Sequence, residues 1–299
     1  MSYMKRIGAF VASVAFTVLS FQASAQTNNL TFTTFNIAWY GLGGSMKNTP
    51  ADEYRNKAIK SFIAKELAKT DVFSFQEIVD VAGLKKNLLP AGWDCESYDH
   101  ESEKHQHVVL CHRPGLQFSR EPSDDNDLID DVARNDGHSR PALHVIVSDS
   151  SGRAITRVIG VHLKAFPTYA VTRYSQAKKI GMYLQAVADP KLPVVILGDF
   201  NTYPAQTNGK DSDDNLNIQT VLNKYQPGMR EVEAPFQNSY RTKKLNSHFD
   251  RIYRSGNVSV ISKASAYSAC NSTDLTEITA YNETISDHCP VSATLKFTR

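Results

Sequence analysis

The sequence predicts a layered α/β or α+β sandwich, and three observations lead to this fold class. The apolar patterns indicate more strands than helices. The helical patterns occur singly, each between stretches that are typical of strands. A short run at residues 194–197 is wholly apolar, which is typical of a strand buried on both faces. Together these features favour sheets covered by helices.

The individual elements follow from their hydrophobic periods. Residues 30–37 alternate and are rich in Thr and Phe, which predicts the first strand. Apolar residues recur at helical spacing in residues 51–68 and 171–188, which predicts two amphipathic helices. Further strands are expected at residues 71–78, 108–111, 142–147, 155–161, 194–197, 252–253, 258–261 and 291–297.

The first 25 residues have the pattern of a secretory signal peptide. Lys5 and Arg6 form a basic start, an apolar run follows at residues 7–21, and residues 23–25 (Ala-Ser-Ala) match a cleavage site. The run is short for a membrane span, which needs ~20 residues. No cysteine for a lipid anchor lies near the cleavage point. We expect cleavage after Ala25, export to the periplasm or out of the cell, and no stable membrane anchor.

The mature chain, residues 26–299, is expected to form one domain. The full chain has 299 residues, 41% of them hydrophobic, and shows no linker long enough to divide it. Loss of Lys5 and Arg6 leaves 31 of the 33 basic residues, against 31 acidic ones. This near-neutral balance does not indicate strong binding to nucleic acid through overall charge. Binding to a polyanion would need a local cluster of basic residues.

Four cysteines in an exported chain suggest disulfides, and four cysteines allow three pairings. Local pairing is favoured: Cys95 with Cys111, and Cys270 with Cys289. The first bond would join two strands, residues 93–98 and 107–112, across a polar hairpin tip. Four buried free thiols are the alternative, which export disfavours. No spacing of Cys and His suggests zinc.

Two polar loops, residues 123–140 and 205–217, are rich in Asp. Either could hold a structural Ca²⁺, although the carboxylates lack the spacing of an EF-hand. A solvated loop is the simpler interpretation. The acidic residues are Asp124, Asp125, Asp127, Asp130 and Asp131 in the first loop, and Asp211, Asp213 and Asp214 in the second.

Polar or ionisable residues stand at the ends of otherwise apolar strands, where layered sheets place ligand and catalytic sites. Each group alone has an ordinary alternative, such as a turn residue, a helix cap, a core histidine or a surface ion pair. A buried strand that opens through Gly198 into Asp199 and Asn201 is more specific. In chain order the groups are Asn36, Gln76-Glu77, His162-Leu163, Gly198-Asp199-Phe200-Asn201, Asp250-Arg251 and Ser286-Asp287-His288.

This ordered set resembles the endonuclease/exonuclease/phosphatase superfamily, and the resemblance spans residues 30–299. Gly-Asp-x-Asn at residues 198–201 and Ser-Asp-His at residues 286–288 are its strongest marks. The resemblance implies a four-layer α/β sandwich, in which two packed mixed β-sheets are flanked by helices, as in pancreatic-type deoxyribonuclease. It also implies a metal-dependent phosphoric-ester hydrolase.

The resemblance implies a metal site made of Glu77, Asn36 and Asp287. Glu77 would be the principal metal-binding carboxylate, with Asn36 beside it, and Asp287 would contact the metal or its water. These side chains supply oxygens and no thiolate, which fits Mg²⁺ or Mn²⁺. Such a cation would neutralise a phosphodiester and polarise it for attack.

The other implied residues act on water and phosphate. Asp199 would orient or deprotonate the attacking water, and Asn201 would hold that water or the phosphate. His288 would be the essential histidine, with Asp250 as its carboxylate partner; whether His288 or Asp199 is the base stays open. The resemblance to the nuclease branch adds a second histidine, His162, and a phosphate-gripping arginine, Arg140.

Two substrate classes remain after this comparison. A secreted endonuclease for DNA or RNA is favoured by export, by the pair His162 and His288, and by Arg140. A phosphodiesterase or phosphatase for a lipid headgroup or an inositol phosphate, like a sphingomyelinase, is the alternative, since overall charge does not favour nucleic acid. An inactive binding protein is disfavoured because the motif set is intact. We expect nucleic acid as the substrate and a monomeric protein.

Overall fold

The computed structural model describes residues 27–44, 51–98, 106–120, 139–186, 189, 191–204 and 213–298. The expected signal peptide lies outside these residues, as do residues 123–138 and 205–212 of the two acidic loops. Among the described residues, no helix is both long and apolar enough to span a membrane.

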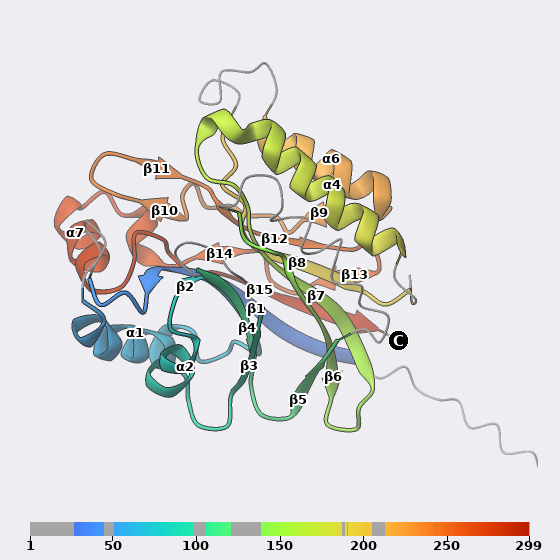
Figure 1. The fold of residues 1–299 in the computed structure, drawn as a ribbon, viewed down its shortest axis with the longest axis horizontal. Coiled ribbons are helices and arrows are strands. Elements are labelled where there is room, and N and C mark those ends of the chain that lie inside the picture. Colours follow the sequence, from blue (N-terminus) through green and yellow to red (C-terminus); the bar gives the residue numbers. More distant parts are fainter. Residues whose placement is uncertain are drawn as a thin grey trace, which may run out of the picture.

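Two large sheets form the centre of the molecule (Figure 1). The seven-stranded sheet has the order β13-β15-β1-β2-β4-β3, with β14 paired to β15, and the six-stranded sheet has the order β5-β6-β7-β8-β12-β9. The first contains β1 (Thr27–Tyr40), β2 (Val72–Ile78), β3 (Asp94–Ser97), β4 (His107–His112), β13 (Val258–Val260), β14 (Ser265–Ala266) and β15 (Val291–Thr298). The second contains β5 (Leu116–Ser119), β6 (Leu143–Asp149), β7 (Ala154–His162), β8 (Val194–Asp199), β9 (Arg230–Glu231) and β12 (Asp250–Arg254).

Helices cover the outer faces of both sheets, so the predicted four-layer sandwich is confirmed. Figure 1 shows α4 (Ala170–Ala186) and α6 (Asp214–Tyr225) side by side over the six-stranded sheet. On the opposite side lie α1 (Asp52–Glu66), α2 (Val81–Gly83), the π-helical turn η1 (Leu84–Leu88) and α7 (Leu275–Thr284). A small hairpin, β10 (Tyr240–Arg241) and β11 (Asn246–Ser247), stands apart from both sheets.

Each sheet contains one parallel pair among antiparallel ones. β1 pairs with β2 in parallel, and β7 pairs with β8 in parallel. The carboxyl ends of parallel strands lie at the same edge of a sheet, where α/β proteins place their ligands. The expected burial of residues 194–197 on both faces is confirmed, because every residue of β8 is buried.

The core forms because strand residues alternate between two apolar layers. Phe32 and Val72 belong to a large cluster that includes residues of both sheets and of α4 and α6. Phe35 and Phe75 belong to a second cluster with the α1 residue Ile59. Full burial of such a side chain contributes about 1.5–3 kcal/mol. The sequence pattern of β1 and β2 therefore sets both interfaces of the seven-stranded sheet.

The prediction that residues 205–217 form one loop is wrong at its end, because α6 begins at Asp214. The side chain of Asp213 accepts a hydrogen bond from the Leu216 amide (3.0 Å), which caps the helix. Asp214 instead accepts from the guanidinium of Arg173 at 3.1 Å. Both carboxylates thus have structural roles, and the other candidate Ca²⁺ ligands lie outside the described residues.

The predicted local disulfides, Cys95–Cys111 and Cys270–Cys289, are confirmed. Cys95 and Cys111 lie opposite each other in the antiparallel pair β3–β4, with their Cα atoms 4.0 Å apart. The second bond joins the 3₁₀ turn η3 (Ser268–Asn271) to the segment before β15. It packs in a small buried cluster with Tyr281 of α7.

Removing the second disulfide by Cys270→Ala with Cys289→Ala should lower the free energy of unfolding by about 3 kcal/mol, the value for a loop of this size. It should also lower activity, because Cys289 directly follows His288. Urea unfolding and steady-state kinetics measure the two effects. The matched control, Cys95→Ala with Cys111→Ala, should destabilise the fold without a comparable loss of activity. Equal activity loss in both pairs would contradict this expectation.

Candidate active site

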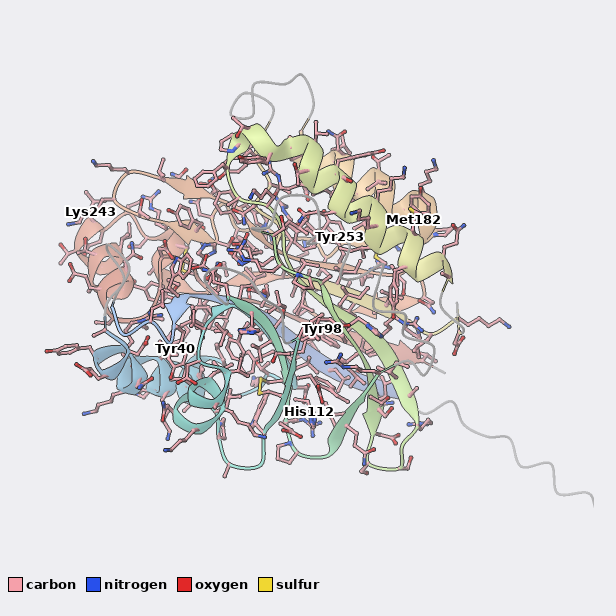
Figure 2. All side chains as sticks on the ribbon, viewed as in Figure 1. Tyr40, Tyr98, His112, Met182, Lys243 and Tyr253 are labelled. Atoms are coloured by element: carbon pink, nitrogen blue, oxygen red, sulfur yellow. A yellow bond between two sulfur atoms is a disulfide. The ribbon has the colours of Figure 1, made fainter. Side chains whose placement is uncertain are left out.

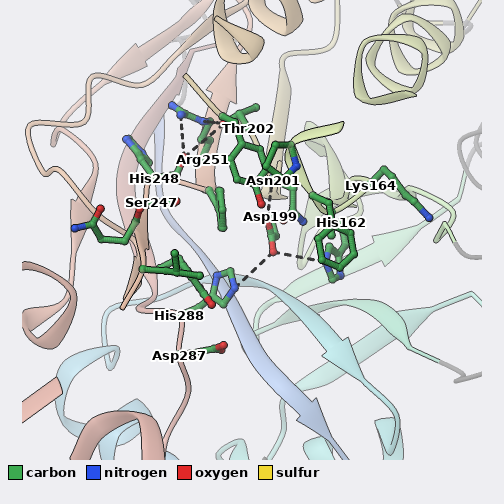
Figure 3. Close-up of a pocket in the computed structure, with 18 of the residues that line it drawn as sticks. His162, Lys164, Asp199, Asn201, Thr202, Ser247, His248, Arg251, Asp287 and His288 are labelled. Carbon is green, nitrogen blue, oxygen red and sulfur yellow. Dashed lines mark hydrogen bonds and ion pairs between the residues drawn. The ribbon is translucent and has the colours of Figure 1, made fainter. Parts of the chain in front are cut away.

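A cavity of 1320 Å³ opens at the strand ends where both parallel pairs finish. Figure 3 shows the side chains that converge there. Asn36 and Asp250 are fully buried and contact the residues that line the cavity. Seven of the nine predicted site residues line it: Glu77, Arg140, His162, Asp199, Asn201, Asp287 and His288.

Strand register brings the residues of the six-stranded sheet together. His162 at the end of β7 is paired with Asp199 at the end of β8, and Asp250 at the start of β12 is paired with the same Asp199. Gly198 is required before Asp199, because a Cβ at Gly198 would lie 2.0 Å from the Val161 carbonyl oxygen. The Gly-Asp step therefore allows the close approach of β7 and β8 at the site.

Glu77 is held at the end of β2 in a left-handed conformation (φ 61°). Its two oxygens accept hydrogen bonds from the side chain of Asn36 (3.2 Å) and the amide of Trp39 (3.1 Å). The fully buried Arg55 donates to the carbonyl of Ala38 (2.9 Å) and so supports the turn that presents the Trp39 amide. Burial raises the pKa of Glu77, and the positive charge of Arg140, which lines the cavity, opposes this shift.

Asp199 is the most enclosed carboxylate that faces the cavity. Oδ1 accepts from the Asn201 amide (2.9 Å), and Oδ2 accepts from the Asn36 side chain (3.1 Å). Burial raises the pKa of Asp199 to about 7, while the imidazolium of His288 acts in the opposite direction. A carboxyl group with a pKa near neutrality is suited to accept a proton.

The two histidines approach the same atom of Asp199 from opposite sides. Nε2 of His162 lies 3.6 Å from Asp199 Oδ2, and Nε2 of His288 lies 3.8 Å from it (Figure 3). Both distances exceed a hydrogen bond. The three groups therefore lie next to one another on the cavity without hydrogen bonds between them, so their polar atoms can contact a bound anion or water in the cavity.

The protonation states of the two histidines differ. Burial lowers the pKa of His162 well below its ordinary value, and the positive charges of Arg140 and His288 lower it further. Burial alone would also lower the pKa of His288, but the carboxylate of Asp250, which lies 2.8 Å from Nδ1, raises it to about 10. At neutral pH one imidazole is thus neutral and the other is a cation.

Asp287 and Arg140 both line the cavity and shift the pKa of Glu77 in opposite directions. The carboxylate of Asp287 raises the pKa of Glu77, whereas the guanidinium of Arg140 lowers it. Arg140 also donates a hydrogen bond to the side chain of Gln106, which lines the same cavity. This contact directs the guanidinium toward the site.

The donor set fits a hard divalent cation. Burial raises the pKa values of Glu77 and Asp199, and a bound cation would favour the ionised form of both carboxylates. Asp199, Asp250 and His288 also offer ligand atoms within 4.8 Å of one another. In that group, however, Asp250 and His288 already bond each other at 2.8 Å. Outside this pair, the carboxylates that line the cavity are Glu77, Asp199, Asp213 and Asp287.

Sequence reasoning assigned Asn36 as a metal ligand, and its amide has a defined orientation here. Nδ2 donates to both Glu77 and Asp199, while Oδ1 accepts from the amide of Ala38 (3.0 Å). The amide therefore holds the two carboxylates, and its oxygen is directed to the main chain. A ligand role for Asn36 stays a prediction.

Several cavity residues were not among the predicted site residues. Two of them, Lys164 and Thr202, directly flank predicted motifs, so the neighbourhood of each motif was a usable signal. His248 precedes the Asp250 motif, and burial together with the charge of Arg251 lowers its pKa to about 3. The residues from the β10–β11 hairpin carry no sequence signal of their own: Tyr240, Lys244, Leu245, Asn246 and Ser247.

The fold and the site define a class: a four-layer α/β sandwich with an acid–histidine cluster at the strand ends. A sequence profile of the Endonuclease/Exonuclease/phosphatase family matches residues 33–288. The chain belongs to this family, whose members are phosphoric-ester hydrolases. A search of curated protein sequences finds no match.

Solved structures share this fold at low sequence identity. An endonuclease/exonuclease/phosphatase from Bacteroides vulgatus has a TM-score of 0.62 and 15% identity, covering 90% of this chain and 98% of that one. TDP2 from D. rerio, complexed with a single-strand DNA product, has a TM-score of 0.59 and 16% identity (89% and 98%). A mannosyl-6-phosphatase from Bacteroides thetaiotaomicron has a TM-score of 0.59 and 15% identity (89% and 99%).

Asp250→Asn should lower the pKa of His288 from about 10 toward or below its ordinary value of ~6.5, because burial then acts without the opposing carboxylate. NMR titration of the imidazole nitrogens measures this directly. Asp94→Asn, which changes an exposed ion pair with Lys85, is the control and should leave the titration unchanged. An unaltered titration of His288 in Asp250→Asn would show that this contact does not set its charge.

The metal-free fold should lose stability as pH rises through the site carboxylates. A carboxyl group whose pKa is raised by folding stabilises the protein below its unfolded pKa of ~4, and this contribution disappears as pH rises. For Asp199 the loss ends near its folded pKa of about 7. We therefore expect Mg²⁺ to raise Tm more at pH 8 than at pH 5.

Thermal unfolding with Mg²⁺ or with EDTA tests this expectation. Asp199→Asn removes one titrating group, so it should reduce the difference in Mg²⁺ effect between the two pH values. The same Tm increase at pH 5 and pH 8 would argue against a cation at these carboxylates.

Proposed function

We propose that the protein is an exported, divalent-metal-dependent phosphodiesterase that cuts DNA or RNA. The observation that carries this proposal is the position of Asp199 Oδ2 between His162 and His288, at 3.6 and 3.8 Å, on a cavity that also holds Arg140. A carboxylate between two imidazoles supplies proton transfer, and a guanidinium binds phosphate. The family supplies the class of reaction, and these residues favour the nuclease branch within it.

The residues of the chain divide the proton transfers between them. Asp199, with a pKa of about 7, is the general base that takes the proton of the attacking water. Asn201, whose main-chain amide donates to Asp199, positions that water or the phosphate. His288 is cationic at neutral pH and stabilises the anionic phosphate or protonates the leaving oxygen. His162 is neutral and presents Nε2 toward the same space.

Glu77 and Asp287 would hold the metal, with Asn36 beside them. The oxygen donors suit Mg²⁺ or Mn²⁺. When bound, the cation supplies charge neutralisation and polarisation of a phosphoryl oxygen. Asn36 contributes by keeping the Glu77 and Asp199 carboxylates in place, with donor distances of 3.2 and 3.1 Å.

Local positive charge in the cavity supports an anionic, extended substrate. Four basic side chains line it, although the mature chain is near neutral overall. Phosphate contacts of this kind position nucleic acid without reading its sequence. The D. rerio relative with a DNA product is consistent with such a substrate. The basic side chains are Arg140, Lys164, Lys244 and Arg251.

The β10–β11 hairpin favours a second candidate, a phosphodiesterase or phosphatase for a lipid headgroup or inositol phosphate. Leu245 is 62% exposed on this hairpin and lines the cavity beside Lys244. Figure 2 labels the neighbouring Lys243 at the outer end of the hairpin. An exposed apolar residue that directly follows two lysines is suited to an anionic membrane surface. The mannosyl-6-phosphatase relative shows that the fold also serves small phosphate esters.

Export follows from the signal pattern at residues 1–25, and the two disulfides support it, because such bonds form in oxidising compartments. We propose that the mature protein begins at Gln26, is a single-domain monomer, and acts in the periplasm or outside the cell. The acidic loops, at residues 123–138 and 205–212, remain candidates for a structural Ca²⁺.

A substrate panel tests the proposed function. Protein recovered from the periplasm or medium, with its N-terminus checked at Gln26, is assayed with Mg²⁺ against plasmid DNA, RNA, sphingomyelin and inositol phosphates. We expect cleavage of nucleic acid and at least ~100-fold loss in His288→Ala, because a proton-transfer group contributes 10²–10⁴-fold. His112→Ala is the control, since His112 lies on β4 and bonds the Arg113 carbonyl. Intact plasmid and RNA beside hydrolysed lipid or inositol phosphate would refute the nuclease assignment.

A further inference from the structure

Exposed apolar side chains gather beside the cavity, between β7 and the first turns of α4. Phe166 is 64% exposed, Tyr169 41%, Val171 65% and Tyr174 43%. Of these four, Phe166 alone is a cavity-lining residue. An aromatic ring that remains in water beside a charged site gains free energy when a ligand covers it.

The main chain at Phe166 has a defined conformation. Phe166 has φ 74° and ψ 143°, a conformation that non-glycine residues rarely adopt. The fully buried Arg173 donates to the carbonyls of Phe166 (2.7 Å) and Lys164 (2.8 Å), and Asp214 fixes the same guanidinium. Gln176 accepts from the Lys164 amide at 3.0 Å. A ring carried on a main chain that is already ordered loses less entropy on binding than a ring on a mobile loop.

Along the sequence, Lys164 lies between the site residue His162 and Phe166. Lys164 comes two residues after His162, and its side chain extends on the His162 side of the cavity (Figure 3). Its Nζ lies 4.9 Å from the centre of the Tyr169 ring. Lys164 and Phe166 both line the cavity, so the segment offers a positive charge and an aromatic ring at its border.

We propose that Phe166 is a stacking platform for a base of single-stranded nucleic acid, with Lys164 contacting the adjoining phosphate. The inference rests on the proposed nuclease function. Single strands bind where aromatic faces alternate with positive charge, since every base has a face to stack and every linkage has a charge. In a duplex the base faces are covered by their neighbours, so the platform discriminates in favour of single strands.

A membrane surface is the other class of ligand for exposed aromatic and basic residues. The position of Phe166 argues against it, because the ring lines the cavity that contains Asp199 and His162. Its main-chain carbonyl is also held by the buried Arg173. These features suit one ordered contact with a nucleotide that is already in the site.

The test compares wild type, Phe166→Ala, Phe166→Leu and Phe166→Trp on three substrates with Mg²⁺. The substrates are (dT)12, a base-free oligomer of twelve tetrahydrofuran phosphodiesters, and a duplex of the same length. Phe166→Ala should lower kcat/KM on (dT)12 by about 5- to 100-fold, the effect of losing one base–aromatic stack. Phe166→Leu should behave like Phe166→Ala, and Phe166→Trp should stay close to wild type.

The base-free oligomer and the duplex should be cut at nearly the same rate by all four proteins. Tyr174→Ala, which removes an exposed ring outside the cavity, is the matched control and should match wild type throughout. Equal losses on (dT)12 and on the base-free oligomer would overturn the proposal, because the ring would then only shape the loop. Wild-type rates in Phe166→Leu, or Phe166-dependent binding to anionic vesicles without an effect on (dT)12, would overturn it as well.

Binding of fluorescein-labelled (dT)12 in EDTA separates this inference from the proposed function. A wild type that binds (dT)12 through Phe166 but cuts no nucleic acid would refute the nuclease and support the platform. A wild type that cuts (dT)12 with no dependence on Phe166 would support the nuclease and refute the platform.

Discussion

At the site, one side-chain amide bonds a carboxylate of each sheet. Nδ2 of Asn36 donates to Glu77 of its own sheet and to Asp199 of the other, at 3.2 and 3.1 Å. Two buried carboxylates so close to one donor would otherwise repel each other. The main-chain contact of Ala38 with Oδ1 fixes which way the amide faces. The positions of Asp199, of Glu77 and of the irregular segment near the end of β1 all depend on this arrangement.

Around Asn36, the two histidines of the site differ in protonation because their surroundings differ. Both histidines are buried, yet only His288 has a carboxylate at hydrogen-bond distance, and so only His288 stays protonated at neutral pH. Asp250 bonds that cation at 2.8 Å, while burial raises the pKa of Asp199 to about 7. An acid and a base can therefore coexist a few ångströms apart.

Sequence reasoning reached the fold class, the strands around the site and both disulfides, because these depend on strong local patterns and short separations. It missed α6 and α7, whose buried apolar residues are few, although Asp213 and Asp274 are capping signals at their starts. The orientation of the Asn36 amide was also out of reach, because it is set by a contact between segments far apart in the chain. Residues 166–169 could be expected from the sequence at a rim of the site, with ordinary packing as the alternative, and the structure places Phe166 at the cavity.

The bond between Cys270 and Cys289 also places a condition on when the site can form. Cys289 is the neighbour of His288, and the bond ties that segment to the turn η3. In a reducing compartment the two sulfurs remain thiols, and the imidazole is carried on a segment without its covalent anchor. We therefore expect the contact between His288 and Asp250 to be fully secured only after this disulfide has formed.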